Sequence, residues 1–98
     1  MDGHMKKYDC LIEDIRYELE AARHYAKEYC KYKGEDRVIA NLYHELAEQE
    51  FKHATMLREH VPKVVMLHDA LPIIWERDNE HITWWMAKVK HTLEMMKD

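Results

Sequence analysis

Residues 37–60 read RVIANLYHELAEQEFKHATMLREH, and this stretch decides the fold. It holds no glycine or proline, and its apolar residues recur at alternating steps of four and three, the spacing of one face of an α-helix. Two polar residues, Glu50 and His53, fall on the same line. The full line is Ile39, Tyr43, Leu46, Glu50, His53 and Leu57. We therefore expect a helix over 37–60 whose buried face carries a carboxylate and an imidazole.

The preceding residues predict a second helix, over 5–33, with the same spacing. Its apolar line is Tyr8, Ile12, Ile15, Leu19, Ala22, Ala26 and Tyr29. Gly34 is expected to close this helix at the C′ position. Asp36 is a good N-cap for the helix that follows. A link this short predicts an antiparallel helical hairpin.

Two prolines indicate helix boundaries in the rest of the chain. Pro62 is expected to end or kink the second helix. Residues 63–70 are predicted to form a short helix, and Pro72 suits the first turn of a last helix that extends to about Lys97. One face of that last helix is apolar, with Trp75, Ile82, Met86, Val89, Leu93 and Met96.

Length and composition fit one helical domain. The chain has 98 residues, of which 47% are hydrophobic and 35% charged, with two glycines and two prolines. So few helix breakers favour long helices. The predicted fold class is all-α, a single domain over 1–98. It consists of an antiparallel helical hairpin over 5–61 and a C-terminal helical extension over 62–98, and residues 1–4 could be a cloning remnant.

Charge and hydropathy argue against several classes of partner. The net charge is −4 and both signs are interspersed, so we expect no nucleic-acid partner. No apolar segment reaches the roughly 20 residues that cross a membrane, and no signal peptide is recognisable, so we expect a cytosolic protein. Cys10 and Cys30 would lie about 30 Å apart on one helix, which excludes a disulfide within the chain. They are expected to be buried free thiols.

Polar residues within apolar lines predict a metal site. Glu50 and His53 are three positions apart, so their side chains project from the same side of a helix and can share one metal. On the first helix, Glu18 lies in the middle of a second apolar line, whereas Glu20 falls on a charged, solvated face. Carboxylates with one imidazole suit iron or manganese better than zinc. Because one chain offers one such set, we expect a two-fold dimer that holds two metal ions.

These residues resemble the ferritin-like superfamily over 8–59. Glu18 followed by Tyr25 is similar to the Glu-x6-Tyr of the first ferritin helix, and EFKH at 50–53 is similar to the Glu-x-x-His of the second. The chain looks most like the encapsulated ferritins, whose subunits carry one helical hairpin and build ferroxidase centres between chains. ELEA at 18–21 and EQEFKHA at 48–54 are similar to stretches of that family.

The resemblance implies a ferritin-like four-helix bundle completed by dimerisation. The implied chemistry is oxidation of Fe(II) to Fe(III) by dioxygen or peroxide. The implied ligands are Glu18, Glu50 and His53, with Tyr25 hydrogen-bonding near the metals.

The chain also departs from that family. Residues 91–98 show no shell-targeting tail, and the spacing from Glu18 to Glu50 is somewhat longer, so we do not expect residence in an encapsulin shell. Rubrerythrin-like peroxidase chemistry is a sibling interpretation, although the Cys-x-x-Cys module of that family is missing. The sequence leaves open iron or manganese, the oligomer size beyond a dimer, and a role in storage, detoxification or peroxide reduction.

Other interpretations compete with a metal site. Glu-x-x-His arises by chance in many charged helices, so the alternative is a non-catalytic helical interaction module with a structural Glu/His network. Asp78 and His81 also have ligand spacing and could supply the other half of a site within one chain. A hemerythrin-like oxygen carrier would need many histidines at His-x-x-x-His/Glu spacing, a pattern that is not convincingly present. Trp75, Trp84 and Trp85 are interpreted as a packing or subunit-contact surface.

Overall fold

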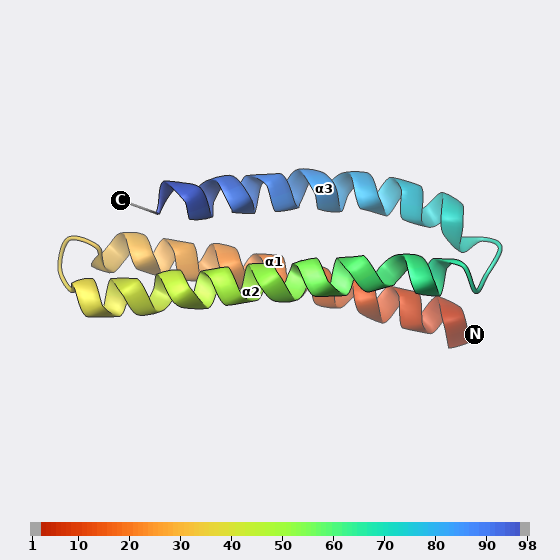
Figure 1. Ribbon diagram of the computed structural model, residues 1–98, viewed down its shortest axis with the longest axis horizontal. Coiled ribbons are helices and arrows are strands. Elements are labelled where there is room, and N and C mark those ends of the chain that lie inside the picture. The colour runs from red at the N-terminus through yellow and green to blue at the C-terminus, as the bar shows by residue number, and fades with distance from the viewer. Residues whose placement is uncertain (1–2, 97–98) are drawn as a thin grey trace.

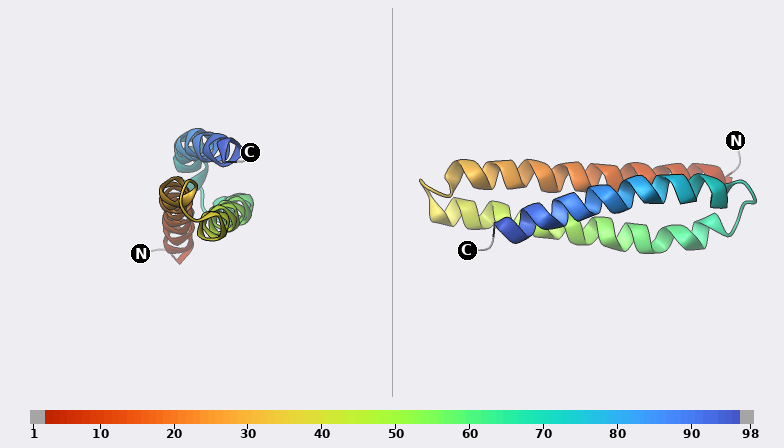
Figure 2. Two further views of the ribbon diagram at one scale, coloured as in Figure 1. Left: turned by 90° about the vertical axis from the view of Figure 1, so that its left-hand side faces the viewer. Right: turned by 90° about the horizontal axis from the view of Figure 1, so that it is seen from above.

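The computed structural model describes residues 3–96, and its elements are the helices α1 (Gly3–Tyr32), α2 (Arg37–Val65) and α3 (Leu71–Met95). α1 and α2 form an antiparallel hairpin, and α3 runs back along one side of it (Figure 1). The end view in Figure 2 shows α3 lying over the hairpin on that side, and no helix formed by residues 3–96 covers the other. The predicted all-α fold with a hairpin and a C-terminal helix is confirmed.

Helices α1 and α2 pack against each other through buried residues that recur every seven positions. All seven residues of the apolar line predicted for α1 are buried. Every second one of them forms a column on α1, namely Tyr8, Ile15, Ala22 and Tyr29. The matching column on α2 is Ala40, Ala47, Ala54 and Val61, each fully buried. A repeat of seven is typical of long helices that stay in contact along a shared seam, and small alanines let the two backbones come close.

The buried face of α2 differs from the prediction. The line predicted to be buried is only half-buried, and the side chain of His53 is 54% exposed. The alanine column, one position to the side, faces α1 instead. The prediction failed because it weighted bulky residues, whereas close helix packing placed the smallest ones in the core.

The turn between α1 and α2 is capped by Asp36, as predicted. The Asp36 carboxylate accepts hydrogen bonds from the backbone N–H groups of Val38 and Ile39, both at 3.1 Å. Gly34 lies in the turn without a positive φ. The turn is closed by the backbone, since the carbonyl of Tyr32 accepts from the N–H of Asp36 at 2.8 Å.

Pro62 does not end α2, the first of the two outcomes expected for it, because the helix continues through this residue to Val65. Proline lacks an N–H, so the helix loses one hydrogen bond there. Burial holds the last turn in place, as Val61, Val64 and Val65 are all buried. The short helix predicted over 63–70 is therefore absent, and residues 66–70 form the connection to α3. Pro72 does lie in the first turn of α3, as predicted.

The cysteines were also placed wrongly, because Cys10 and Cys30 are both exposed free thiols. Each lies outside the buried line of α1, where solvent rather than the core is the neighbour.

Helix α3 is held by an apolar face and by polar contacts at both of its ends. Its buried residues are Leu71, Ile82, Met86, Val89 and Leu93. The Tyr8 hydroxyl donates to Asp78 at 2.6 Å, and the Tyr29 hydroxyl donates to the carbonyl of Met96 at 3.1 Å. Trp75 and Trp85 pack partly buried against the core, whereas Trp84 is 62% exposed.

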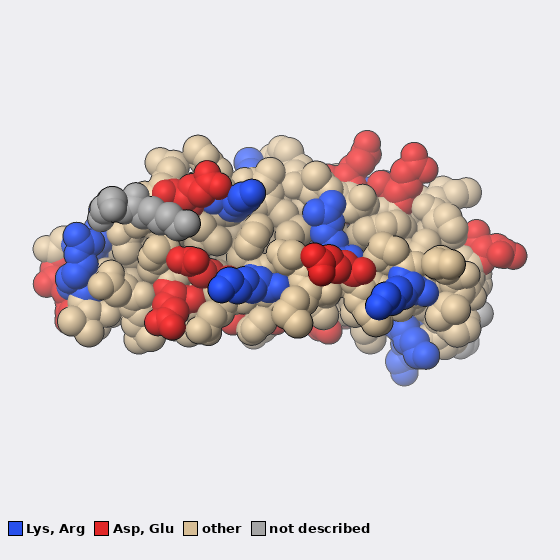
Figure 3. Space-filling view, in the orientation of Figure 1, with Lys and Arg blue, Asp and Glu red and all other residues tan. Residues whose placement is uncertain are grey.

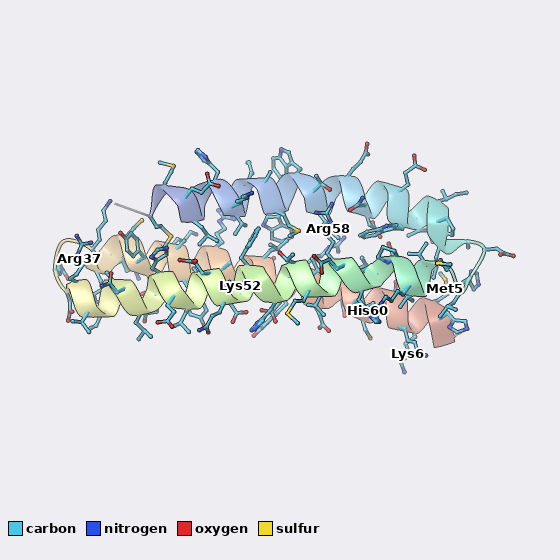
Figure 4. The ribbon with its side chains drawn as sticks, in the orientation of Figure 1. Met5, Lys6, Arg37, Lys52, Arg58 and His60 are labelled. Carbon is cyan, nitrogen blue, oxygen red and sulfur yellow. The ribbon has the colours of Figure 1, made fainter. Side chains whose placement is uncertain are left out.

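Arg58 provides the polar contact in the middle. It points from α2 toward α3 (Figure 4), where its guanidinium donates to Asn79 at 2.9 and 3.1 Å and to Thr83. Acidic and basic side chains alternate over the face in Figure 3 without forming a patch of one sign. Within the described helices, none is both long and apolar enough to cross a membrane.

Candidate metal centre

Glu18 from α1 meets Glu50 and His53 from α2 near the middle of the hairpin. One ligand atom from each of the three lies within 4.8 Å of the other two. Within residues 3–96 this is the one group of three or more His, Cys, Asp or Glu side chains with such geometry. The structure therefore brings together the three residues that the sequence predicted as ligands.

The register of the hairpin explains the meeting. Glu18 lies opposite Glu50, and seven residues closer to the turn Tyr25 lies opposite Tyr43, with ring centroids 6.0 Å apart. Because the helices are antiparallel, each step of seven on one helix is matched by a step of seven back along the other. The buried columns fix this register, and the register in turn places the two carboxylates opposite each other.

Glu18 is the most informative of the three side chains. It is only 21% exposed, and its Oε2 atom is buried without a hydrogen-bond partner. The Nδ1 atom of His53 is 3.6 Å away, which is too long for a hydrogen bond. Leaving a buried acceptor unsatisfied costs about 1–3 kcal/mol, and more when the group is charged. A cation between Glu18, Glu50 and His53 would remove this cost.

The donor set fits a particular kind of cation. Two carboxylates and one imidazole offer oxygen with some nitrogen and no sulfur, which suits iron or manganese. Neither Cys10 nor Cys30 belongs to the group, so the soft ligands that favour zinc or copper(I) are missing from it.

The site opens on the side of the hairpin that α3 leaves uncovered. His53 and Arg58 are five residues apart, roughly 140° around a helix, and Arg58 is the residue that reaches α3. Leu42 and Met56 lie close to the angular position of His53 and are 52% and 68% exposed. His53 thus faces outward beside exposed apolar groups, at the exposed edge of a group whose two carboxylates are half-buried.

Tyr25 lies two helical turns from Glu18, about 10 Å along α1. Its ring contacts are with Tyr43 and with His24, at centroid distances of 6.0 and 5.6 Å. The predicted hydrogen bond of Tyr25 near the metals stays a prediction.

Asp78 and His81 do not join the site. Asp78 accepts the hydrogen bond of Tyr8, and burial together with this bond raises the pKa of the Tyr8 hydroxyl well above its usual value. His81 is exposed. Both residues are therefore explained without a metal.

The remaining acidic residues also lie outside the group. Glu20 is exposed, as the sequence predicted, and so is Glu45. Glu48 is half-buried and contacts the Nε2 atom of His44 at 2.8 Å.

Sequence reasoning missed two residues that matter here. Tyr43 was assigned to the apolar line of α2 without notice that it precedes Glu50 by the seven residues that separate Glu18 from Tyr25. Arg58 was not singled out, although it follows Ala54 by four positions and so places a cation beside the buried column. The first could have been found from an assumed antiparallel register, and the second from a charge next to a line of small residues.

Comparison of the chain with protein-family models, with curated proteins and with solved structures gives no match. The ferritin-like resemblance thus stays a prediction, and the function is inferred from the geometry of the site.

Proposed function

We propose that the protein is a ferritin-like di-iron carboxylate protein, a ferroxidase that oxidises Fe(II) at a site shared by two copies of the chain. The observation that supports this proposal most directly is the buried Oε2 atom of Glu18, which has no hydrogen-bond partner and lies beside Glu50 and His53. Manganese is the second metal that the donor set accepts.

Charge arithmetic supports two ions per dimer. Each chain contributes two carboxylates and one neutral imidazole to the site. Two chains bring four negative charges, which two divalent cations neutralise. A buried or half-buried site is most stable when its charges balance in this way.

The uncovered side of the hairpin supports dimerisation. Half-buried apolar residues surround the ligands there, and they are Leu11, Tyr25, Tyr43, Leu46 and Leu57. Pairing this side with its two-fold mate would cover these residues and place two hairpins in one four-helix bundle. A chain of 98 residues buries a small core by itself, so it gains more from association than a larger domain would.

The reaction treats iron as the substrate. Two Fe(II) ions each give one electron to dioxygen, which takes up two protons and leaves as hydrogen peroxide. Glu18 and Glu50 hold the ions and favour the more highly charged product Fe(III). His53, at the exposed edge, supplies a nitrogen ligand where ions enter.

The test combines iron binding with measurement of the oligomer. Wild-type protein is titrated with Fe(II) without oxygen, its mass is measured by light scattering, and air is then admitted while Fe(III) absorbance is followed. We expect a dimer, one iron per chain, and oxidation faster than in protein-free buffer. Glu50→Gln should abolish all binding, whereas the exposed Glu59→Gln on the same helix should bind like wild type.

Two results would contradict the proposal. One is equal iron binding by Glu50→Gln and wild type. The other is no bound iron at all, with unchanged stability of Glu50→Ala, which would favour the non-catalytic interaction module.

A further inference from the structure

A groove between α1 and α3 lies apart from the metal centre. Its volume is about 710 Å³, which is typical of small-molecule sites in proteins. Helix α1 contributes Ala22, Arg23 and Ala26, and α3 contributes residues within 84–93. Arg23 follows Glu18 by five residues, roughly 140° around α1, so the groove faces away from the side proposed for dimerisation.

The wall of the groove is largely apolar. Ala22 and Ala26 form it on α1, and Trp85, Val89 and Leu93 form it on α3. All five are buried or half-buried by the fold itself, and the two alanines leave room that larger side chains would have filled. An apolar molecule in the groove would remove the remaining surface of these residues from water.

The charged side chains that line the groove are all cationic. They are Arg23 and Lys88, joined by the imidazole of His91, and no aspartate or glutamate within residues 3–96 lines it. The whole chain has 15 lysines and arginines against 19 aspartates and glutamates, so a lining without acidic groups is unlike the rest of the surface. The side chains of Arg23 and His91 make no hydrogen bond or ion pair with the described part of the chain.

The register of α1 and α3 places these cations together. The two helices run in the same direction (Figure 1), and the hydrogen bond from Tyr29 to the carbonyl of Met96 fixes how they lie along each other. Arg23 precedes Tyr29 by six residues, and His91 precedes Met96 by five, so Arg23 is roughly level with His91. Lys88 is one turn before His91 on α3.

Trp84 lies at the other end of the groove. Trp84, Lys88 and His91 recur at steps of four and three, so they share one flank of α3. The indole of Trp84 is 62% exposed, and the Nζ atom of Lys88 lies 4.1 Å from its ring centroid. The groove thus has an aromatic end at Trp84 and a cationic end at Arg23 and His91, about 10 Å apart along α3.

We propose that this groove binds an amphiphilic organic anion, a molecule with an apolar body and one carboxylate or phosphate group. The body lies against the indoles of Trp84 and Trp85, and its length matches the distance between the two ends of the groove. The anionic group accepts hydrogen bonds from Arg23 and His91, which are stronger than those between neutral groups. The site needs no iron and is independent of the proposed metal centre.

Such a ligand stabilises the docking of α3 on α1. The hydrogen bonds that Tyr8 and Tyr29 of α1 make to α3 are received at Asp78 and Met96. The groove lies between these two bonds, where the anion bridges Arg23 of α1 and His91 of α3. Because the folded chain alone offers both helices to the ligand, binding raises the melting temperature.

The experiment titrates the full chain with three probes by calorimetry. Decanoate tests an acyl body, 2-naphthoate tests an aromatic body, and decyltrimethylammonium carries the same length of tail with the opposite charge. Arg23→Gln removes the charge at the cationic end. Arg16→Gln is the matched control, because Arg16 is exposed, lies on the same flank of α1 seven residues earlier and is outside the groove.

We expect one decanoate or one 2-naphthoate per chain, a higher melting temperature and a shift in tryptophan emission. The tighter of the two identifies the kind of body. Arg23→Gln should weaken binding by about 10-fold, since a hydrogen bond from a charged donor is lost, whereas Arg16→Gln should bind like wild type.

Three results would overturn the proposal. The first is that neither anion binds. The second is that decyltrimethylammonium binds as tightly as decanoate, which would show that the charge of the groove selects nothing. The third is that Arg23→Gln and Arg16→Gln have the same affinity. Each of these results leaves the proposed iron chemistry standing, because no step of the experiment uses iron.

Discussion

Arg58 and His53 lie on opposite flanks of the same helix, and the polar groups around them are satisfied in different ways. On the flank covered by α3, Arg58 donates hydrogen bonds to Asn79 and Thr83. On the open flank, Glu18, Glu50 and His53 come within 4.8 Å of one another, yet the buried oxygen of Glu18 accepts no hydrogen bond.

The difference between the two flanks distinguishes residues that stabilise the fold from residues that are candidates for a function. Hydrogen bonds completed within the chain stabilise the fold, and their residues need no ligand. A buried acceptor that the described part of the chain leaves unsatisfied is a place where a bound ligand would lower the free energy. The two flanks should therefore respond to substitution in opposite ways.

The largest effect is expected for Glu18→Gln. Loss of a charged ligand should weaken iron binding by at least about 100-fold, since even substitutions behind the ligands cost 10–100-fold. The metal-free protein should not lose stability, because an unsatisfied carboxylate is replaced by a neutral group. Calorimetric titration and urea unfolding measure the two quantities. Glu20→Gln, next along the chain and exposed, should match wild type in both, and a large loss of metal-free stability in Glu18→Gln would show that the open flank is structural.

The next effect is expected on the covered flank. Arg58→Leu should lower the free energy of unfolding by about 2 kcal/mol, because hydrogen bonds from a charged donor are lost and the Asn79 acceptor stays half-buried. Affinity for iron should be unchanged. Urea unfolding checks the first statement and metal titration the second, with the exposed Lys52→Leu as the control. Weaker iron binding in Arg58→Leu would mean that the two flanks are coupled.

The pH dependence of the stability of Tyr8→Phe tests the same flank, the one that α3 covers. Its hydrogen bond to Asp78 is lost, so stability near neutral pH should fall by about 1.5 kcal/mol. Burial and the Asp78 carboxylate raise the pKa of Tyr8 in the folded protein. In the unfolded chain the same group titrates near its ordinary value of about 10.

The sign of the pH effect follows from this raised pKa. Above about pH 10 the unfolded chain loses the proton first, so the contribution of Tyr8 to stability is complete below that pH and declines as pH rises. Wild type should thus lose stability more steeply above about pH 10 than Tyr8→Phe. The exposed Tyr17→Phe should keep the steep decline, and parallel curves for Tyr8→Phe and wild type would contradict the assignment.

The smallest effect is expected at the turn, which belongs to neither flank. Asp36→Ala removes the N-cap of α2 and should cost about 1 kcal/mol. Neither the affinity of the folded protein for iron nor the alkaline decline should change. Thermal unfolding, with the exposed Glu35→Ala as reference, measures the loss. A change in iron affinity would mean that the cap sets the register at the site.

The sequence predicted some parts of this structure and not others. Side-chain size and the register between helices explain the difference. The apolar line of α1 was correct at every position because most of its residues are large and all of them are regularly spaced. On α2 the core column consists of alanines and one valine, which hydrophobic spacing weights weakly, so the neighbouring line was taken for the core. Pro62 does not end α2, because burial of the valines around it outweighs one missing hydrogen bond.

The sequence singled out three residues that the structure brings together, because a carboxylate or imidazole within an apolar line is unusual wherever that line lies. It did not predict the pairing of residues between helices, since sequence periodicity fixes the face of each helix but not how two helices slide along each other. The pairing of Tyr25 with Tyr43 needed the register. The finding that Asp78 accepts the hydrogen bond of Tyr8 also needed knowledge of how the helices lie against each other.

The alanine column has a consequence for the choice of ion. Glu18 and Glu50 are carried by different backbones, and the gap between those backbones is set by Ala47 and Ala54, which flank Glu50 along α2 and are fully buried. One extra methyl group in that column would push the helices apart and spread the oxygens. In the proposed metal centre, the radius of the cation that fits would therefore be set by residues that do not touch it, and exchanging alanine for glycine or serine there would change metal selectivity without altering a proposed ligand.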